Sequence, residues 1–284
     1  MNDKKVYYFP DSFINGNLAA SAGATIVETS YVKRNIEDFK NSVFLVRGIT
    51  KNKYCLALKS VGADYFYIDT GYFGNFNTYY GVGEIRKKFF HRAAFNQMQM
   101  HDLVKRNNSR YLKTLEYIKL DFGLREDDFL KPWKTSGNKI MLCPPSEKVA
   151  AVTGIDVSKW ISNVSEEIKK YSDREIIIRT KPKSRSERVG TNTIQDALDQ
   201  DIYMVVTYNS IAATESIIHG VPALTLGPNA ASKVSLNKIK NINNPIYPNR
   251  QLWLNNLAYG QFHITEYRDG TAWKYLKEYI NQNE

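Results

Sequence analysis

The sequence has few of the residues that build disulfide frameworks, metal centres or membrane spans. It holds two cysteines and four histidines among 284 residues, and neither cysteine has a partner at metal-ligand spacing. No apolar run reaches the ~18 residues of a transmembrane helix, and the first residues lack the apolar core of a signal peptide. We therefore expect no membrane partner, no secretion by that route, and reduced, buried thiols at Cys55 and Cys143 in a cytoplasmic protein.

The residues that are present describe a folded, basic protein. With 43% hydrophobic and 24% charged residues, the 284-residue chain is long enough for two domains of about 100 to 150 residues. The 39 basic and 29 acidic residues give a net charge of +10, which favours a polyanionic partner without requiring one. Five basic residues fall within ten positions, where a solvated loop is the plain alternative: Arg179, Lys181, Lys183, Arg185 and Arg188.

Strands and helices alternate along the first half of the chain. Apolar runs predict strands at 6–10, 43–47 and 65–69, and the residues between them predict helices at 17–32 and 51–61. This βαβαβ order indicates a parallel sheet. The glycine-rich stretch 70–83 predicts a loop, the stretch 85–117 a mainly helical region, and 121–138 a linker.

A second alternating half begins at residue 139. The predicted strands are 140–143, 175–179, 201–207 and 221–226, and the predicted helices are 158–171, 193–198, 250–259 and 271–281. The sequence therefore predicts an α/β protein made of two parallel-sheet halves.

The segment Asn-Ser-Ile-Ala-Ala-Thr-Glu-Ser-Ile-Ile-His-Gly-Val-Pro, residues 209–222, is the most informative stretch. It follows a strand, forms a helix and stops at Gly220, so its beginning lies at the carboxyl end of a parallel strand, where ligands collect. Free N–H groups there favour a pyrophosphate near Asn209 and Ser210. Glu215 lies roughly 7 Å along the helix, within reach of ribose hydroxyls. The alternative to this ligand site is that Asn209 or Ser210 is an ordinary N-cap and Glu215 a solvated helix residue.

The run Glu-Ser-Ile-Ile-His-Gly-Val-Pro resembles the end of the nucleotide-sugar signature of GT-B glycosyltransferases, in which a Glu holds the donor ribose. Upstream the chain departs from that family, since Val206-Thr207-Tyr208 replaces a His and a Gly-rich turn. The resemblance implies a GT-B-like fold with two Rossmann-like, doubly wound domains facing a central cleft. It also implies an acceptor domain at 1–134, a nucleotide-sugar domain at 135–262, and a C-terminal helix at 263–284 that crosses back to the first domain.

Polar residues after the other strands of the second half extend this site. Ser146 and Lys148 follow strand 140–143, while Arg179 and Lys181 follow strand 175–179. Cations at this edge neutralise the charge that develops on a departing diphosphate, although each one alone is also compatible with a surface loop. Asn229 and Ser232 are further candidates for donor contacts.

No metal signature accompanies these residues. The histidines are scattered, and no Asp-x-Asp of the kind that holds a metal in GT-A enzymes is recognised, so no essential metal is expected.

Transfer to a hydroxyl needs a base, and two carboxylates follow strands of the first half. Asp69 ends the strand 65–69 and is the first candidate, and Asp11, after the first strand, is its rival; either also suits a turn or an N-cap. His91, on the expected helix 85–117, is interpreted as a surface or core residue. His219 is interpreted as a partner of the helix C-terminus.

Three segments extend the resemblance over most of the chain: Tyr-Tyr-Phe-Pro-Asp-Ser-Phe-Ile-Asn-Gly-Asn, Tyr-Ile-Asp-Thr-Gly-Tyr-Phe-Gly-Asn and Leu-Cys-Pro-Pro-Ser-Glu-Lys. They resemble the DNA glycosyltransferases of T-even-like phages, above all those that place arabinose on 5-hydroxymethylcytosine. This implies a UDP-sugar donor, with UDP-arabinose favoured and UDP-glucose the alternative. It also implies duplex DNA containing 5-hydroxymethylcytosine as acceptor, protection of that DNA from host nucleases, and the cytoplasm of an infected cell.

The first half offers residues for a DNA partner. Basic side chains would grip phosphates and aromatic ones would stack on a base, although a packed loop explains the aromatics equally well. The basic residues are Arg34, Arg47, Lys51, Lys53, Arg86, Lys87, Lys88 and Arg92, and the aromatic residues are Tyr72, Phe73, Phe76 and Tyr79. Two alternatives stay open: a GT-B glycosyltransferase or UDP-sugar epimerase of surface polysaccharide synthesis, and a DNA-binding protein without enzymatic activity.

Overall fold

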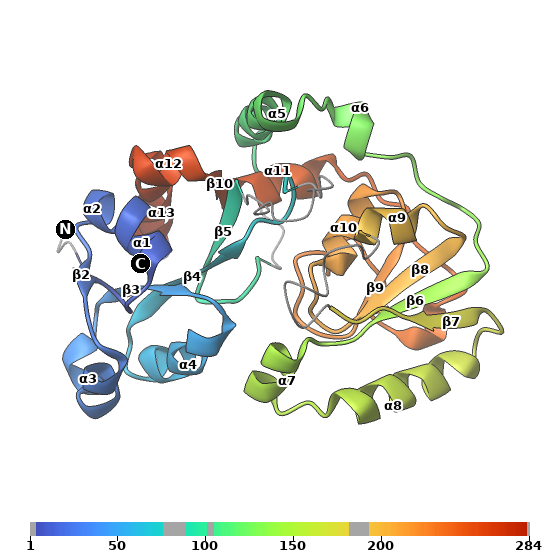
Figure 1. Cartoon of the computed structure of the whole chain (residues 1–284), viewed down its shortest axis with the longest axis horizontal. Coiled ribbons are helices and arrows are strands. Elements are labelled where there is room, and N and C mark those ends of the chain that lie inside the picture. The colour runs from blue at the N-terminus through green and yellow to red at the C-terminus, as the bar shows by residue number, and fades with distance from the viewer. Residues whose placement is uncertain (1–3, 76–88, 101–104, 182–192, 283–284) are drawn as a thin grey trace, which may run out of the picture. The chain divides into compact units, whose positions relative to one another are not determined.

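The structure is a computed structural model that describes residues 4–75, 89–100, 105–181 and 193–282 (Figure 1). The chain divides into two compact units. The first takes its described residues from 4–75, 89–100 and 258–282, and the second takes them from 105–181 and 193–257. The units carry no functional assignment by themselves, so the acceptor and donor domains expected at 1–134 and 135–262 stay predictions.

The first unit is built on a six-stranded sheet in the order β10-β5-β4-β3-β1-β2. The strands are β1 (Val6–Tyr8), β2 (Thr25–Ile26), β3 (Val43–Arg47), β4 (Asp64–Thr70), β5 (Phe90–Phe95) and β10 (Gln261–His263). β1 to β4 pair in parallel, whereas β5 pairs antiparallel with β4 and β10 antiparallel with β5. β3 is apolar along almost its whole length because both faces of the sheet are covered.

Each face of this sheet has its own core. Leu45, Ile68 and Phe262 belong to one core, which includes residues of α1 (Ser12–Asn17), α2 (Ala19–Ala22), α12 (Ile264–Arg268) and α13 (Thr271–Gln282). Phe44 and Val46 belong to the other, together with residues of α3 (Thr29–Arg34), η1 (Ile36–Phe39) and α4 (Lys53–Ser60). The short helix η2 (Ile49–Lys51) precedes α4. Helices on both faces make this a doubly wound unit (Figure 1).

Two predictions for this unit are wrong. The single helix expected at 17–32 is broken at Gly23, whose φ of 57° is left-handed, and β2 and α3 follow it. The helical region expected at 85–117 contains β5, and α5 (Ser109–Phe122) begins only later. His91 accordingly lies on a strand and is buried. Pairing with β4 and β10 satisfies the backbone of β5, and the local sequence does not reveal these partners.

The second unit is built on a four-stranded parallel sheet in the order β7-β6-β8-β9. The strands are β6 (Lys139–Cys143), β7 (Glu175–Ile178), β8 (Ile202–Thr207) and β9 (Ala223–Thr225). Besides α5, the other elements are α6 (Glu126–Phe129), α7 (Glu147–Thr153), α8 (Val157–Lys169), α9 (Ile194–Leu198), α10 (Ala212–Ile218), η4 (Ile239–Asn241) and α11 (Gln251–Tyr259). α8 packs on one face with Ile140 and Leu142, and α9 and α10 pack on the other with Met141 and Cys143.

The end of α10 is fixed by the segment that precedes β6. Gly220 has a φ of 80°, and a Cβ there would lie 1.9 Å from the Pro132 carbonyl oxygen. Arg250 donates to the carbonyls of Ile217 and Lys131, at 2.7 Å each, with its guanidinium 4.6 Å from the Trp133 ring centroid. The predicted stop of this helix at Gly220 is therefore confirmed, since only a residue without a side chain fits here.

Candidate active site

The carboxyl ends of the four strands of the second unit share one edge of the sheet. Leu142 pairs with Ile178, Cys143 with Thr207, and Thr207 with Thr225. The segments 144–148, 179–181, 208–211 and 226–232 therefore all begin at this edge, which is where parallel sheets bind ligands.

The turn between β8 and α10 is held by hydrogen bonds at this edge. The buried Thr207 hydroxyl donates to the Cys143 carbonyl at 2.7 Å and accepts from the Ser210 N–H at 3.4 Å. The Ser210 hydroxyl accepts from the Ala212 N–H at 3.2 Å. α10 begins at Ala212, and Ile211 occupies the N-cap without a capping side chain. Asn209 and Ser210 thus lie in the turn, two residues and one residue before the N-cap position, respectively.

Glu215 and Arg179 lie near the same buried thiol at the end of β6. Burial raises the pKa of Cys143 to about 12; the positive charge of Arg179 opposes this change and the negative charge of Glu215 adds to it. Glu215 is half-buried in the first turn of α10, and Arg179 is half-buried after β7. Because the Arg179 N–H donates to the Leu142 carbonyl at 2.9 Å and α10 follows β8, both predicted site residues lie at the carboxyl edge of the sheet.

The remaining predicted donor-site residues are distributed along the same edge. Ser146 caps α7, because its hydroxyl accepts from the Val149 N–H at 3.4 Å. Lys148 and Lys181 are exposed. The other basic residues of the 179–188 run, Lys183, Arg185 and Arg188, lie outside the described residues.

The prediction that Asn229 contacts a ligand is wrong. Its side chain is wholly buried: Nδ2 donates to the Ser210 carbonyl at 2.9 Å, and Oδ1 accepts from the Ala231 N–H at 2.9 Å. The hydroxyl of Ser232, the other candidate, accepts from the Asn229 N–H at 3.2 Å. A buried amide has to satisfy both its groups, and here the protein does so.

In the first unit, Asp69 is the penultimate residue of β4, and its side chain is 40% exposed. One carboxylate oxygen accepts from the Tyr67 hydroxyl at 3.1 Å and pairs with Arg92 at 3.4 Å, and the other accepts from the Thr70 N–H at 2.7 Å. Arg92 is buried, and it also donates to the carbonyls of Thr70 (2.6 Å) and Met98 (3.1 Å). Asp69 is thereby oriented while part of its surface stays open.

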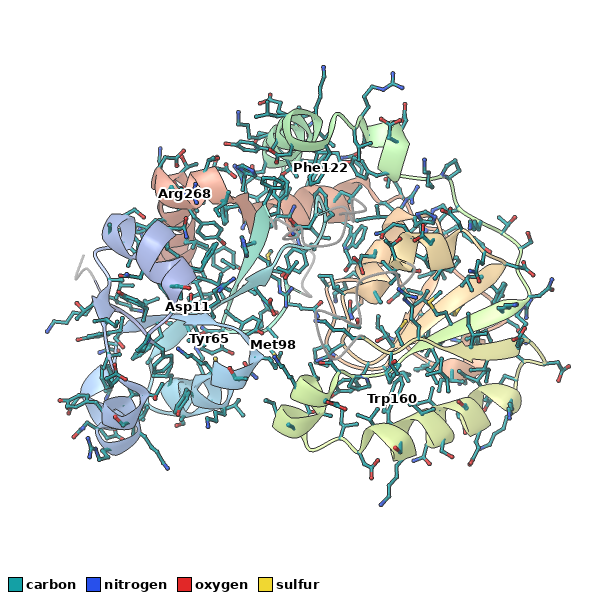
Figure 2. All side chains as sticks on the ribbon, viewed as in Figure 1. Asp11, Tyr65, Met98, Phe122, Trp160 and Arg268 are labelled. Carbon is teal, nitrogen blue, oxygen red and sulfur yellow. The ribbon has the colours of Figure 1, made fainter. Side chains whose placement is uncertain are left out.

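Asp11 serves as the N-cap of α1 (Figure 2). One oxygen accepts from the N–H groups of Phe13 and Ile14 at 3.0 and 3.1 Å. The other lies 3.5 Å from Arg47, and the Asp11 side chain is only 18% exposed. Asp11 therefore caps a helix, whereas Asp69 lies near the end of a strand, and the choice of either as base stays a prediction.

Most described basic candidates for DNA binding have contacts within the protein. Arg92 pairs with Asp69, Arg47 with Asp11, and Lys51 donates to the Pro10 carbonyl. Arg34 and Lys53 are exposed, whereas Arg86, Lys87 and Lys88 lie outside the described residues. The prediction that Arg92 grips phosphate is therefore wrong.

Two of the aromatic candidates are part of the protein interior. Tyr72 and Phe73 are buried, and their N–H groups donate to the Gln261 side chain at 2.7 and 3.1 Å. The prediction that they stack on a base is therefore wrong, because the loop packs against β10. Phe76 and Tyr79 lie outside the described residues.

The expectation that the sequence has no Asp-x-Asp is wrong, because Asp199 and Asp201 form one. Asp199 lies 2.8 Å from His219, and Asp201 accepts from Asn138 at 2.8 Å. They precede β8, at the edge opposite the candidate site. Within the ranges that the structure describes, no three His, Cys, Asp or Glu side chains gather as metal ligands.

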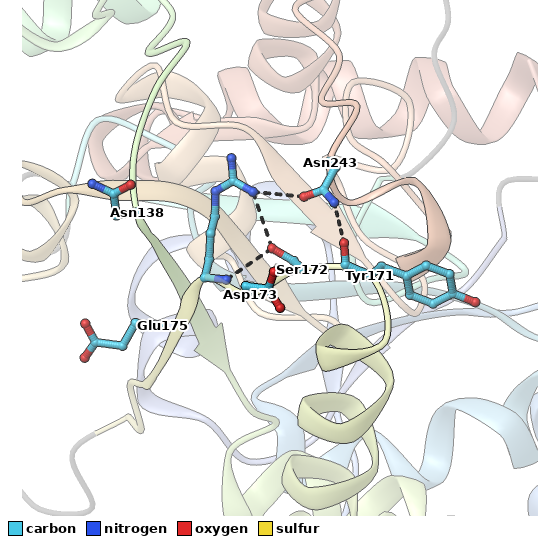
Figure 3. Close-up of a pocket in the computed structure, with 7 residues that line it drawn as sticks. Asn138, Tyr171, Ser172, Asp173, Glu175 and Asn243 are labelled. Atoms are coloured by element: carbon cyan, nitrogen blue, oxygen red, sulfur yellow. Dashed lines mark hydrogen bonds between the residues drawn. The ribbon is translucent and has the colours of Figure 1, made fainter.

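A cavity of about 580 Å³ also lies at this opposite edge (Figure 3). Arg174, which lines it, donates to the Gly137 carbonyl, the Ser172 hydroxyl and the Asn243 side chain, and lies 3.6 Å from the Tyr203 ring centroid. These contacts join the amino ends of the strands, so we assign the arginine a structural role.

Comparison with known proteins places the fold. The chain is similar to two solved structures from Thermosulfurimonas dismutans. The KpsC beta Kdo 2,7 transferase matches with a TM-score of 0.55 and 12% identity over 95% of this chain and 99% of that one. The KpsC beta Kdo 2,4 transferase matches with a TM-score of 0.50 and 11% identity over 93% of each chain. No family model and no curated protein matches.

These likenesses confirm the predicted α/β, GT-B-like fold class. At 11 and 12% identity they establish the fold and leave the reaction to the site residues. Among the described helices, none is both long and apolar enough to span a membrane.

Proposed function

We propose that the protein is a glycosyltransferase that binds a UDP-sugar at the carboxyl edge of the second unit's sheet. The observation that carries the proposal is the placement of Arg179 and Glu215 at one edge: the Arg179 N–H donates to the Leu142 carbonyl near the end of β6 at 2.9 Å, and Glu215 lies in the first turn of α10, directly after the turn that holds Ser210. A carboxylate that can accept hydroxyl hydrogens and a guanidinium that can bind phosphate thus share one edge.

Each group has a distinct task in this proposal. Glu215 accepts hydrogen bonds from the ribose hydroxyls, and the turn at Asn209 and Ser210 faces the diphosphate. Arg179 and Lys181, with Ser146 and Lys148 along the same edge, stabilise the charge on the diphosphate as the bond to the sugar breaks. In this scheme, no essential metal is required.

Asp69 is the proposed base. It takes the proton of the acceptor hydroxyl while that oxygen bonds to the anomeric carbon and the diphosphate leaves with the bonding electrons. Asp11 is the rival, but its oxygens cap α1 and pair with Arg47, whereas the Asp69 side chain is 40% exposed. The partners of Asp69 orient it without enclosing it.

For the acceptor we favour 5-hydroxymethylcytosine in duplex DNA, with arabinose as the sugar and glucose as the alternative. The net charge of +10 supports a polyanionic acceptor. Such a modification would protect phage DNA from nucleases in an infected cell.

A second candidate is sugar transfer during surface polysaccharide synthesis. It is supported by the likeness to two Kdo transferases over at least 93% of the chain. The donor edge would be used in the same way, and only the acceptor would differ.

The experiment that separates these activities offers labelled UDP-arabinose, UDP-glucose and an activated Kdo donor to the purified protein. The acceptors are hydroxymethylated DNA, unmodified DNA and a Kdo-terminated oligosaccharide. Label on hydroxymethylated DNA alone supports the first proposal, and label on the oligosaccharide supports the second. No transfer with any pair refutes both.

Site variants test the assignment of roles. Glu215→Ala should weaken UDP binding about tenfold, a loss of about 1.4 kcal/mol, with unchanged DNA affinity. Asp69→Asn should abolish turnover with UDP binding preserved. Glu166→Ala, an exposed glutamate on α8 that accepts from Ser162, is the matched control. Equal loss of UDP and DNA binding in Glu215→Ala contradicts the donor assignment, and near-normal turnover in Asp69→Asn moves the role of base to Asp11.

A further inference from the structure

The segment 226–232, which follows β9, is fastened to the turn that follows β8. The N–H groups of Leu226 and Gly227 donate to the carbonyls of Thr207 and Tyr208, at 2.9 and 3.1 Å. A Cβ at Gly227 would lie 2.6 Å from the Tyr208 ring, so the ring rests directly on the main chain. The two segments therefore pack as one layer at the candidate donor edge.

Asn229 is the side chain that joins them further along. The Ser210 carbonyl accepts both from Nδ2 of Asn229, at 2.9 Å, and from the Ala213 N–H of α10, at 3.3 Å. Both lone pairs of this oxygen are thus used, which fixes the peptide at the beginning of the helix. Because Asn229 is wholly buried, it acts on a ligand through the residues that it holds, of which Ser210 lies in the turn before α10.

The position of Asn229 is in turn determined from the opposite side. The Trp253 indole of α11 is 1% exposed and donates to the Ala230 carbonyl at 2.8 Å. The Ala231 N–H donates to Oδ1 of Asn229, which leaves Nδ2 to donate toward Ser210. The buried bonds form a continuous connection from α11 to the turn before α10.

We propose that Asn229 is a positioning residue for the donor diphosphate, holding the turn at Ser210 in its binding conformation before the donor arrives. This inference rests on the proposed function. A turn that is already ordered costs less to bind to, so loss of the Asn229 amide should raise the donor Kd and KM while the chemical step keeps its rate.

The test compares Asn229→Asp with the wild type by calorimetric titration of UDP and by steady-state kinetics. Aspartate keeps the oxygen that accepts from Ala231 but cannot donate to Ser210. The expected result is a UDP Kd and donor KM about tenfold higher, with kcat within about twofold.

Asn255→Asp is the matched control, because Asn255 is also buried in this unit and donates to the Arg106 carbonyl at 3.4 Å. It should lower the melting temperature without changing the UDP Kd. Gly227→Ala disturbs the same layer through Tyr208 and should also raise the Kd, which keeps the proposal testable if Asn229→Asp does not fold.

Three outcomes overturn the inference. The first is an unchanged UDP Kd in Asn229→Asp, or in Gly227→Ala if that is the only variant that folds. The second is an equal rise in the Asn255→Asp control, since a general loss of stability would then explain the effect. The third is a wild-type protein that binds neither UDP nor any UDP-sugar, which refutes the proposed function itself and is recognised before any variant is made.

Discussion

The carboxylate of Asp64, at the beginning of β4, joins three separate segments of the first unit. It accepts from Lys4 at 3.0 Å, from Lys59 of α4 at 3.0 Å and from the Asn96 amide at 2.8 Å, and its side chain is 16% exposed. Asp64→Asn removes the charge and leaves one acceptor oxygen in nearly the same shape. The substitution therefore tests the ionic part of the cluster.

The expected loss follows from the individual contacts. A hydrogen bond to a charged group contributes about 1.5–3 kcal/mol and a partly exposed ion pair about 0.2–1 kcal/mol. Asparagine retains one of these contacts, and water screens the lysines, so we expect Asp64→Asn to destabilise the first unit by about 1–2 kcal/mol at pH 7.

The loss of stability caused by Asp64→Asn should become smaller as the pH falls. Burial alone would raise the pKa of the Asp64 carboxyl, but hydrogen bonds from Asn96, Lys59 and Lys4 outweigh it, so the pKa lies below its ordinary value of 3.8. The unfolded chain therefore binds a proton first, and the stabilisation present above about pH 4 is lost as the pH falls through the folded pKa. Wild type and variant should become similar in strong acid.

Native-state thiol labelling measures this unit separately from the second. Cys55 is 1% exposed on α4 in the first unit, Cys143 is 5% exposed in the second, and burial raises the pKa of each thiol to about 12. Each should react only when its unit opens. At pH 7 the variant should label Cys55 about 5 to 30 times faster, with unchanged labelling of Cys143.

The exposed Glu116, which pairs with Lys113 at 2.8 Å, provides the control Glu116→Gln, for which no change is expected. Melting curves at pH 7 and about pH 3 test whether the difference in stability between wild type and Asp64→Asn decreases in acid. Equal acceleration at both cysteines, or a difference in melting temperature that persists undiminished in acid, refutes the reasoning.

Three further predictions follow from contacts described above. Gly220→Ala should cost at least about 2 kcal/mol, because its φ is 80° and the Pro132 carbonyl occupies the space of a Cβ; an unchanged melting temperature contradicts this. Arg250→Met should cost about 2–4 kcal/mol in urea unfolding, because it removes a charged donor from the Lys131 carbonyl and leaves the Ile217 carbonyl only the Gly220 N–H, whereas Arg125→Met, at a side chain 77% exposed, should be neutral; equal effects would refute the role of Arg250 at the end of α10. Tyr67→Phe should lower kcat about fivefold at constant donor KM by removing a donor to Asp69, and a changed UDP Kd would contradict this.

Strands buried on both faces could be predicted from the sequence. The strand predicted at 43–47 has the same bounds as β3, and those predicted at 140–143 and 201–207 match β6 and β8 to within one residue at either end. An unbroken apolar run bounded by polar residues is sufficient for such a prediction. The grouping of loops at one sheet edge then follows from the parallel order.

Contacts between distant segments could not be predicted in this way. β5 is a strand because β4 and β10 supply its hydrogen bonds, and β10 comes about 170 residues later in the chain. The sequence predicts a donor contact at Asn229 because the run 226–232 continues from the last strand of the second half. The burial of Asn229 depends on Ser210 and Trp253, whose proximity no local pattern indicates.

The first unit is discontinuous in the chain, since its sheet is completed by β10 and its core by α13. The ribosome synthesises the chain from the N-terminus, so β1 to β5 leave it long before β10, the strand that pairs with the edge of β5. The second unit can fold co-translationally, whereas the first unit can complete its sheet and core only after the C-terminal residues have been synthesised. During that interval the exposed edge of β5 is the surface most open to mispairing or chaperone capture.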